Sequence, residues 1–204
     1  MFTFKNYSKG VNFTVEKLIV ASNNKGKIKE IKSILSSRYE IISMSEAGYK
    51  GEIEENGASF YENALIKARA VAEALSCDAL ADDSGLCVDS LNGAPGVFSA
   101  RFSGVHGDDK ANRIKLLEML KGKENRNAEF KSSVVLCKKN GEIFVGYGET
   151  KGCILEKETG ENGFGYDSLF YSYDLNKSFG EASNEEKNSV SHRYRALCDL
   201  LSKL

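Results

Sequence analysis

The chain has 204 residues, of which 41% are hydrophobic, and its 28 basic and 29 acidic side chains give a net charge of −1. At ~100–200 residues per domain, this length predicts one domain, or one domain with a modest second lobe, and the apolar share excludes a disordered protein. The balanced charge lacks the basic field that non-specific nucleic-acid binding needs, and no apolar run approaches the ~18 residues of a membrane span. The N-terminal residues contain no hydrophobic signal block. We therefore expect a cytoplasmic protein without a nucleic-acid or membrane partner.

The first half of the chain alternates apolar runs with helical patterns. The expected elements are a strand at 18–21, a helix at 25–35, a strand at 40–44 and a helix at 59–75. Ser59 is a suitable N-cap for the last helix, with Glu62 completing a capping box. An acidic, glycine-containing stretch separates the second strand from this helix.

The second half contains one long hairpin and a helical end. The expected elements are buried strand segments at 79–81 and 86–91 interrupted by Asp82-Asp83-Ser84-Gly85, a turn at 92–96, a helix at 108–120, strands at 128–137 and 142–147, and a helical tail at 183–204. Asn140-Gly141 is a strong hairpin signal. No repeat or linker divides the chain. We expect an α/β fold, with a single domain at 17–204 after an N-terminal extension of unknown role at 1–16.

The residue types present restrict the metals that the protein can hold. The five cysteines include no Cys-x-x-Cys pair, and His106 and His192 are the only histidines. This pattern argues against a disulfide framework, a thiolate zinc site or a multi-histidine site. Any metal would be held by carboxylates, which favours Mg²⁺, with Mn²⁺ as the alternative.

A polar loop separates the first expected strand from the first expected helix. Its residues are Ser22, Asn23, Asn24, Lys25, Gly26 and Lys27. Backbone N–H groups at a helix N-terminus, together with a lysine and small polar side chains, suit a phosphate group. The loop is not a Walker A motif, and an ordinary capped turn is the competing interpretation.

Two adjacent acids, Asp82 and Asp83, lie within an apolar segment. Ionised carboxylates are costly in such surroundings unless they are paired or bind a metal. Adjacent strand residues point to opposite sides, so one acid is available for a divalent ion or a water while the other anchors the loop. The competing interpretation is a strand-end turn. A glutamate from the earlier acidic stretch, 52–55, could complete a carboxylate site, although a solvated acidic loop is commoner.

Two later segments add candidate ligand groups. In Gly163-Phe164-Gly165-Tyr166-Asp167, aromatic residues between glycines suit a loop whose ring stacks on a planar base, or a tight turn with a buried Phe. Near the C-terminus, Lys187 could reach a phosphate, and His192 and Arg193 could donate hydrogen bonds to carbonyl oxygens. Each of these groups also has an ordinary structural explanation.

Taken together, the segments resemble the inosine triphosphate pyrophosphatase family, which cleaves non-standard purine nucleoside triphosphates. The matching segments, in family order and at family-like spacing, are LIVASNNKGKIKEI, EIEENGASFYENALIKA, LADDSGLCVDSLNGAPGVFSARFSG, NGFGYDSLF and EEKNSVSHR. They cover nearly all of the chain after about the first sixteen residues. The resemblance implies an elongated α/β fold with a central mixed sheet and flanking helices, in two lobes separated by a substrate cleft, and usually a homodimer.

The resemblance also implies a role for each matching residue. Asp83 would be the catalytic residue, as base or metal ligand, and Glu54 the likelier second metal ligand, with Glu55 as its close competitor. The triphosphate would be held by the 22–27 loop, Lys67 and Lys187, with Ser84 beside the substrate. The base would stack on Phe164 in a pocket formed with Gly165, Tyr166, Asp167, His192 and Arg193.

These observations predict magnesium-dependent hydrolysis of ITP, dITP and XTP to the nucleoside monophosphate and pyrophosphate. A nucleotide-binding sensor without turnover is the alternative from another class, although a carboxylate pair would add little to simple phosphate binding. Hydrolysis of a different nucleotide, such as a modified pyrimidine triphosphate, is the third possibility.

Overall fold

The computed structural model describes residues 16–204, so the predicted extension lies outside the described residues except for Glu16. The strands are β1 (Glu16–Val20), β2 (Tyr39–Ser43), β3 (Ala79–Val88), β4 (Asn127–Cys137), β5 (Ile143–Ile154), β6 (Phe170–Ser172) and β7 (Lys177–Ser178). The α-helices are α1 (Lys25–Leu35), α2 (Phe60–Leu75), α3 (Asp109–Met119), α4 (Asn184–Val190) and α5 (His192–Leu201). Short 3₁₀ helices are η1 (Asp89–Leu91), η2 (Gly96–Arg101) and η3 (Asp167–Leu169).

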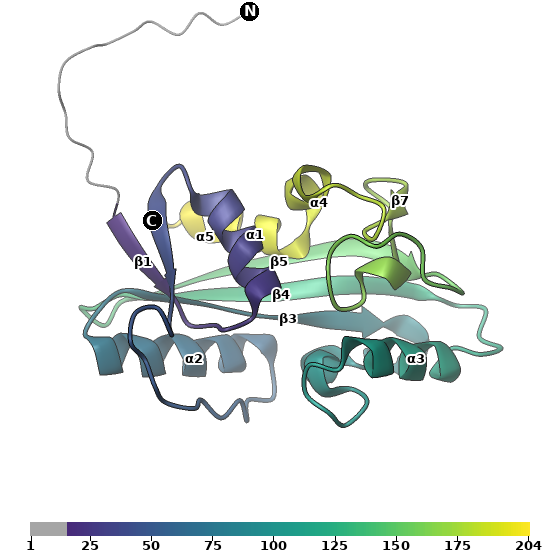
Figure 1. The fold of residues 1–204 in the computed structure, drawn as a ribbon, viewed down its shortest axis with the longest axis horizontal. Helices are drawn as coiled ribbons and strands as arrows, with labels where there is room; N and C mark the ends of the chain where they lie inside the picture. Colours follow the sequence, from purple (N-terminus) through teal and green to yellow (C-terminus); the bar gives the residue numbers. More distant parts are fainter. Residues whose placement is uncertain (1–15) are drawn as a thin grey trace, which may run out of the picture.

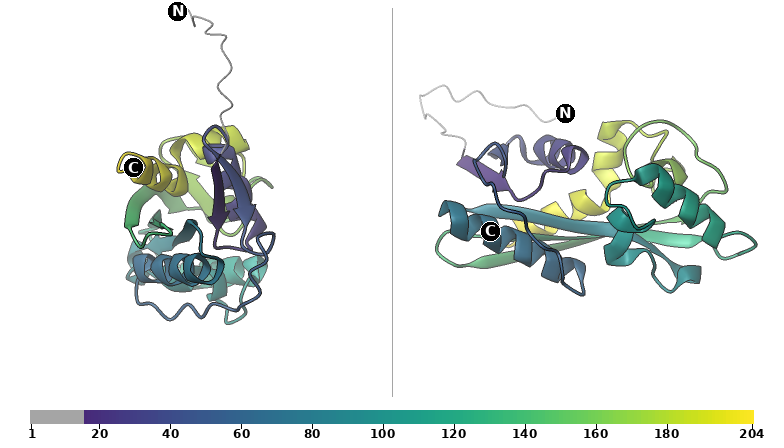
Figure 2. Two further views of the ribbon diagram at one scale, coloured as in Figure 1. Left: turned by 90° about the vertical axis from the view of Figure 1, so that its left-hand side faces the viewer. Right: turned by 60° about the horizontal axis from the view of Figure 1, so that its bottom comes forward.

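All seven strands form one mixed sheet in the order β2-β1-β3-β4-β5-β6-β7. β1 is parallel to both β2 and β3, whereas the remaining neighbours are antiparallel. The sheet is elongated along β4 and β5, with α2 and α3 on one side and α1, α4 and α5 on the other (Figures 1 and 2). This arrangement confirms the predicted α/β class with a mixed sheet and flanking helices. No helix within 16–204 is both long and apolar enough to cross a membrane.

Three groups of buried side chains form the core. One packs α1 and α5 on β1, β3 and β4, and another packs the alanine-rich face of α2 on the opposite side of the same strands. The third lies toward the other end of the sheet, where Phe130, Phe170 and Phe179 pack together with Leu116 of α3 and Leu120 at its C-cap. The long strands β3 and β4 contribute to groups at both ends of the molecule. They therefore connect two separately packed regions.

Some predicted boundaries were wrong. β3 runs without interruption through Asp82-Asp83-Ser84-Gly85, because each of these residues pairs with β4. β5 continues past Tyr147 to Ile154, since its glycines let α5 pack closely: a Cβ on Gly148 would lie 2.1 Å from the His192 carbonyl oxygen. The helical tail is two helices, because the extended backbone of Ser191 ends α4 and caps α5.

The predicted cap of α2 is confirmed only in part. The Ser59 hydroxyl accepts the Glu62 N–H at 3.2 Å, as expected. The Glu62 carboxylate, however, accepts the N–H of Ala58 at 2.6 Å and not that of Ser59. A full capping box occurs instead at α4, between Ser183 and Glu186.

Buried charges connect the helical layer of α1, α4 and α5 to the sheet. Glu30 of α1 accepts hydrogen bonds from Arg193 of α5 and, at 2.8 Å, from Lys187 of α4. Arg193 also reaches Asp82 of β3 at 3.1 Å, and Lys187 reaches Asp167 at 2.6 Å. We call these five residues the buried charge cluster. Burial raises the pKa of Glu30, but Arg193 and Lys187 outweigh it and lower that pKa from 4.5 to about 2.

This shift predicts acid sensitivity that depends on Glu30. Because its folded-state pKa is lowered, the stabilisation is complete above the unfolded value of 4.5 and is lost as pH falls toward 2. A shift of that size corresponds to about 3 kcal/mol. Glu30→Gln should lower the free energy of unfolding at pH 7 and reduce its loss between pH 4.5 and 2. Urea unfolding at stepped pH measures both effects.

The exposed Glu40→Gln on β2 is the matched control and should behave as wild type. An acid dependence in Glu30→Gln as steep as that of the wild type would show that Glu30 does not contribute in this way.

Candidate functional site

The candidate site lies where the parallel part of the sheet ends. β1 pairs with β3 only through Ile19–Ala79 and Val20–Leu80, so β3 continues past the end of β1. The carboxyl ends of parallel strands are the usual place for ligands in open α/β sheets. The 22–27 loop leaves β1 at this point, and Asp82 and Asp83 follow directly on β3.

The 22–27 loop forms a capped helix start. Asn24 accepts the Lys27 N–H at 3.0 Å, and its own N–H donates to the Ser22 hydroxyl at 3.1 Å. Asn23 and Lys25 are exposed. This end of α1 presents backbone N–H groups and the positive end of a helix dipole, which together favour an anion.

Asp82 is the anchoring member of the acid pair. Its carboxylate contacts Lys27 at 2.9 Å, Arg193 at 3.1 Å, and the hydroxyls of Ser132 at 2.5 Å and Ser84 at 3.0 Å. It is 1% exposed. Burial opposes its ionisation, but the neighbouring Arg193 and Lys27 hold its pKa well below the usual value. Asp82 is therefore ionised, and its carboxylate oxygens are already paired with these side chains.

Asp83 points to the opposite face of the sheet, toward α2. Lys67 donates to its Oδ1 at 2.8 Å and Asn63 to its Oδ2 at 3.4 Å. Burial raises the pKa of Asp83; Lys67 and Lys27 oppose this rise, and the Glu55 carboxylate adds to it. A carboxylate with a raised pKa beside a lysine has the properties of a general base.

The two acidic candidates for a second carboxylate differ in position. Glu54 is exposed, whereas Glu55 is half-buried and accepts from Lys67 at 2.7 Å. Because Lys67 also contacts Asp83, the geometry favours Glu55 over Glu54 as the partner of Asp83. Among residues 16–204, no three His, Cys, Asp or Glu side chains gather as a complete metal cage. Two carboxylates are nevertheless the donor set that Mg²⁺ uses when water and phosphate complete its shell.

The 163–167 loop brings an aromatic ring to the start of α1. Gly163 and Gly165 have positive φ angles of +78° and +60°, and the Phe164 N–H donates to Asp167 at 2.8 Å. The Phe164 ring lies against Gly26: a Cβ added there would be 2.6 Å from the ring. Gly26 is therefore needed because the ring occupies the space that a side chain would fill.

Lys187 lies with this ring and not with the other lysines of the site. Its ammonium is 4.7 Å from the centre of the Phe164 ring and is paired with both Glu30 and Asp167. Lys27 and Lys67, by contrast, both donate to the Asp82 carbonyl oxygen. The structure thus assigns Lys187 to the aromatic side of the site.

His192 and Arg193 begin α5, on the same side of the sheet as α1 (Figure 1). His192 stacks on Phe130 with ring centres 4.8 Å apart, and burial, followed by Arg193, holds its pKa well below the usual value. The ring is therefore neutral at pH 7. His192 Nδ1 and Arg193 Nε have no hydrogen-bond partner within 16–204. Both atoms are buried polar groups with unused hydrogen-bonding capacity.

Most of the site residues predicted from the sequence lie around β3, but some of them form hydrogen bonds to other protein groups. Tyr166 is buried and its hydroxyl donates to the Ser99 carbonyl oxygen at 2.9 Å. Ser84 accepts from Arg193 at 2.8 Å. Glu30 and Asn63 were not predicted from the sequence. A signal existed for Asn63, because it is four residues before Lys67 and thus on the same face of α2.

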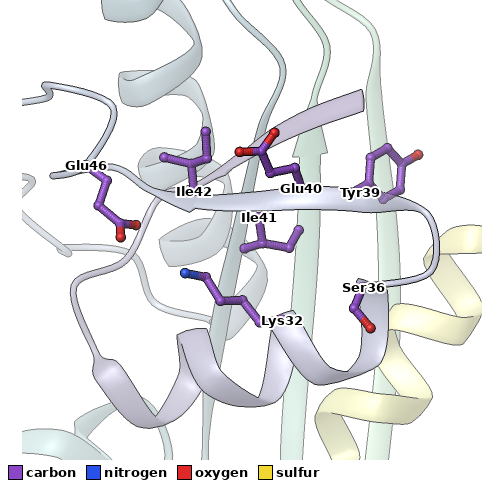
Figure 3. A pocket seen from close by; sticks show the side chains of 7 residues that line it. All are labelled: Lys32, Ser36, Tyr39, Glu40, Ile41, Ile42 and Glu46. Atoms are coloured by element: carbon purple, nitrogen blue, oxygen red, sulfur yellow. The ribbon is translucent and has the colours of Figure 1, made fainter. Parts of the chain in front are cut away.

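A shallow pocket of about 520 Å³ lies elsewhere, between α1 and the edge strand β2 (Figure 3). It is lined by Lys32, Ser36, Tyr39, Glu40, Ile41, Ile42 and Glu46. None of these residues belongs to the charged groups around Asp82 and Asp83. We therefore assign the functional site to the end of β1 and the middle of β3.

Comparison with known proteins shows which family the chain resembles. The model of the Ham1 family matches residues 18–203. The dITP/XTP pyrophosphatase of Desulforamulus reducens is 47% identical over 89% of this chain and 92% of its own, and that of Bacillus subtilis is 46% identical over 93% and 97%.

Solved structures give the same result. The Staphylococcus aureus Ham1 protein superposes with a TM-score of 0.82 at 40% identity, covering 92% of this chain and 97% of its own. The nucleoside-triphosphatase, or dITP/XTP pyrophosphatase, of Mycobacterium abscessus gives a TM-score of 0.73 at 45% identity, covering 91% and 98%. These matches confirm the family resemblance inferred from the sequence motifs, and the chain belongs to the Ham1 family.

Proposed function

We propose that this protein hydrolyses non-standard purine nucleoside triphosphates, namely ITP, dITP and XTP, to the nucleoside monophosphate and pyrophosphate. The observation that carries the proposal is that the two adjacent acids of β3 have different partners on the two faces of the sheet. Asp83 meets Lys67 and Glu55 on one face, and Asp82 meets Lys27 and Arg193 on the other. The names of the 42–48% identical relatives, all dITP/XTP pyrophosphatases, support the same substrates.

The triphosphate is bound by the 22–27 loop, Lys27 and Lys67. Its several negative charges must be neutralised before a nucleophile can approach phosphorus. The start of α1 supplies N–H groups, and both lysines already lie together on the Asp82 carbonyl oxygen, at 3.5 and 3.1 Å. Glu55 and Asp83 would hold Mg²⁺, which supplies further charge neutralisation and polarises phosphoryl oxygens when bound.

Asp83 takes part in the chemical step. Water attacks the α-phosphorus, its proton passes to the Asp83 carboxylate, and the bond from the α-phosphorus to the bridging oxygen breaks to release pyrophosphate. Lys67 orients Asp83 through its 2.8 Å contact, and Asn63 holds the other carboxylate oxygen. Burial raises the pKa of Asp83 above its usual value, which makes this carboxylate a better proton acceptor.

The base stacks on Phe164 and is read by donors from α5. Hypoxanthine and xanthine carry an acceptor oxygen at position 6, where adenine carries an amino donor. The unpartnered atoms of His192 and Arg193 support recognition of that oxygen. With adenine, protein donors are left unpaired at a cost of about 1–3 kcal/mol each. Lys187 serves this side of the site, because it fixes Asp167 and lies over the Phe164 ring.

We also propose a domain organisation, a cellular compartment, an oligomeric state and the kinds of partner. Residues 17–204 act as one pyrophosphatase domain, with 1–16 as an extension of unknown role. The enzyme works in the cytoplasm as a homodimer and uses neither nucleic acid nor membrane as a partner.

The products of ITP turnover test the reaction. With Mg²⁺ present, the protein should release pyrophosphate, seen as orthophosphate only after inorganic pyrophosphatase is added. Across ITP, XTP, GTP, ATP and dUTP, kcat/KM for ITP and XTP should exceed that for ATP by about tenfold or more, because adenine leaves buried donors unpaired. Orthophosphate as the first product would reject the proposal, and tight ITP binding without turnover would favour a sensor.

Asp83→Asn tests the general base. Asparagine keeps the shape and an oxygen acceptor for Lys67, but it cannot take the proton, so kcat should fall by about 10²–10⁴ while circular dichroism and the melting temperature change little. Asp89→Asn, at an exposed acid just beyond β3, is the matched control and should remain active. An active Asp83→Asn enzyme would remove Asp83 from this role.

The pair Glu54 and Glu55 tests the metal site. Glu55→Gln should raise the Mg²⁺ concentration for half-maximal activity by at least about tenfold, because one of two anionic ligands is lost. Glu54→Gln changes the same charge at an exposed position and should leave that concentration unchanged. Mg²⁺ titration of initial rates distinguishes them, and the reverse result would assign Glu54 as the ligand.

A further inference from the structure

Helix α3 holds the backbone of the 163–167 loop from outside the site. The N–H of Gly165 donates to Asp109 Oδ2 at 2.9 Å, and the carbonyl oxygen of Gly165 accepts from Arg113 Nη1 at 2.9 Å. Both polar groups of one residue are therefore bound by two side chains of one helix. Gly165 is the residue directly after Phe164, and its φ angle of +60° is one that L side chains rarely adopt.

The two side chains come from adjacent turns of α3. Asp109 and Arg113 are four positions apart, which places them on one face of α3. The Arg113 Nε also lies 3.0 Å from Glu158 Oε1, and Glu158 in turn accepts from the Ser168 hydroxyl at 3.1 Å. Arg113 therefore joins α3 to both sides of the 163–167 loop.

The loop has little other freedom around the ring. Phe164 is fixed at its N–H by Asp167, and Tyr166 is fixed at its hydroxyl by the Ser99 carbonyl oxygen. Between these two points, the Gly165 peptide groups determine the direction of the Phe164 side chain. Together with the Asp167 N–H, which donates to the Phe164 carbonyl oxygen at 3.1 Å, the α3 contacts restrain a glycine backbone that has wide intrinsic freedom.

We propose that Asp109 and Arg113 are positioning residues that set the Phe164 ring for stacking on the nucleobase. This inference rests on the proposed function, and it assigns to α3 a part in base recognition although α3 contributes no group to the phosphate side. The two contacts of these residues to Gly165 form a clamp on the loop. Loss of this clamp should weaken interactions with the base and leave the triphosphate interactions and the chemical step intact.

The test compares Asp109→Ala with Asp109→Asn and with Asp108→Ala. Asp109→Ala removes the acceptor for Gly165, and KM for ITP should rise about tenfold with kcat changed less than about twofold. Asp109→Asn keeps an oxygen acceptor and should restore most of the wild-type KM. Inorganic tripolyphosphate, which has no base, should inhibit all of these variants with the wild-type inhibition constant.

Asp108→Ala separates positioning from helix stability. Asp108 is the N-cap of α3 and accepts the Ala111 N–H at 2.9 Å, but it does not contact the loop in the structure. This variant should lower the melting temperature and keep the wild-type KM. Arg113→Met should reproduce the KM effect of Asp109→Ala, since it removes the other contact to Gly165.

The outcomes are distinguishable from failure of the proposed function. Wild-type protein that neither binds nor cleaves ITP would reject both proposals. Wild-type protein that cleaves ITP, together with an Asp109→Ala variant of unchanged KM, would reject the clamp alone. An equal rise in KM for Asp108→Ala, or a parallel rise in the tripolyphosphate inhibition constant, would reduce Asp109 to a structural role and overturn the proposal.

Discussion

The burial of Arg193 is the interaction on which the rest of the structure depends. A guanidinium that is 1% exposed is tolerable only when acids surround it, and removal of one partner from such a buried pair is strongly destabilising. Its partners, Glu30 and Asp82, come from α1 and β3, and Arg193 itself begins α5. One side chain near the C-terminus therefore connects the first helix to the central strand.

The pairing of Arg193 with Asp82 also gives the adjacent acids Asp82 and Asp83 different roles. Strand alternation places Asp82 and Asp83 on opposite faces of the sheet, and Arg193 and Lys27 commit Asp82 to the ionised, fully paired state. Asp83, on the α2 face, has a pKa that burial raises, and it shares Lys67 with Glu55. Neighbours in the sequence thus become an anchor and a reactive group because different helices cover the two faces of one strand.

These contacts between residues distant in the sequence also explain which features could be predicted from the sequence and which could not. Local patterns predicted α1, α2, the hairpin and the Ser59 cap, since spacing and capping chemistry act within a few residues. The polar residues 82–85 argued for a break in β3, but Arg193, Lys27 and Lys67 satisfy both acids, and the strand continues. The preference for Glu54 over Glu55 as a metal ligand stays a prediction, although the fold brings Glu55 to Lys67. The assignment of Lys187 to the triphosphate rested on the resemblance and stays a prediction; the structure shows its ammonium paired with Glu30 and Asp167.

The contact between Phe164 and Gly26 sets the separation between the aromatic ring and the start of α1. Gly26 belongs to the loop proposed to bind phosphate, and a Cβ there would already lie 2.6 Å from the ring. The ring cannot approach α1 further, and on its far side the Gly165 backbone is held by Asp109 and Arg113. A stacking surface and a phosphate-binding helix end are thereby kept at constant separation. In the proposed reaction, a nucleotide bridges these two points through its sugar, while its triphosphate is held separately at the start of α1. A base that stacks poorly then loses binding energy while its phosphates keep their contacts, so discrimination between bases acts on KM more than on kcat.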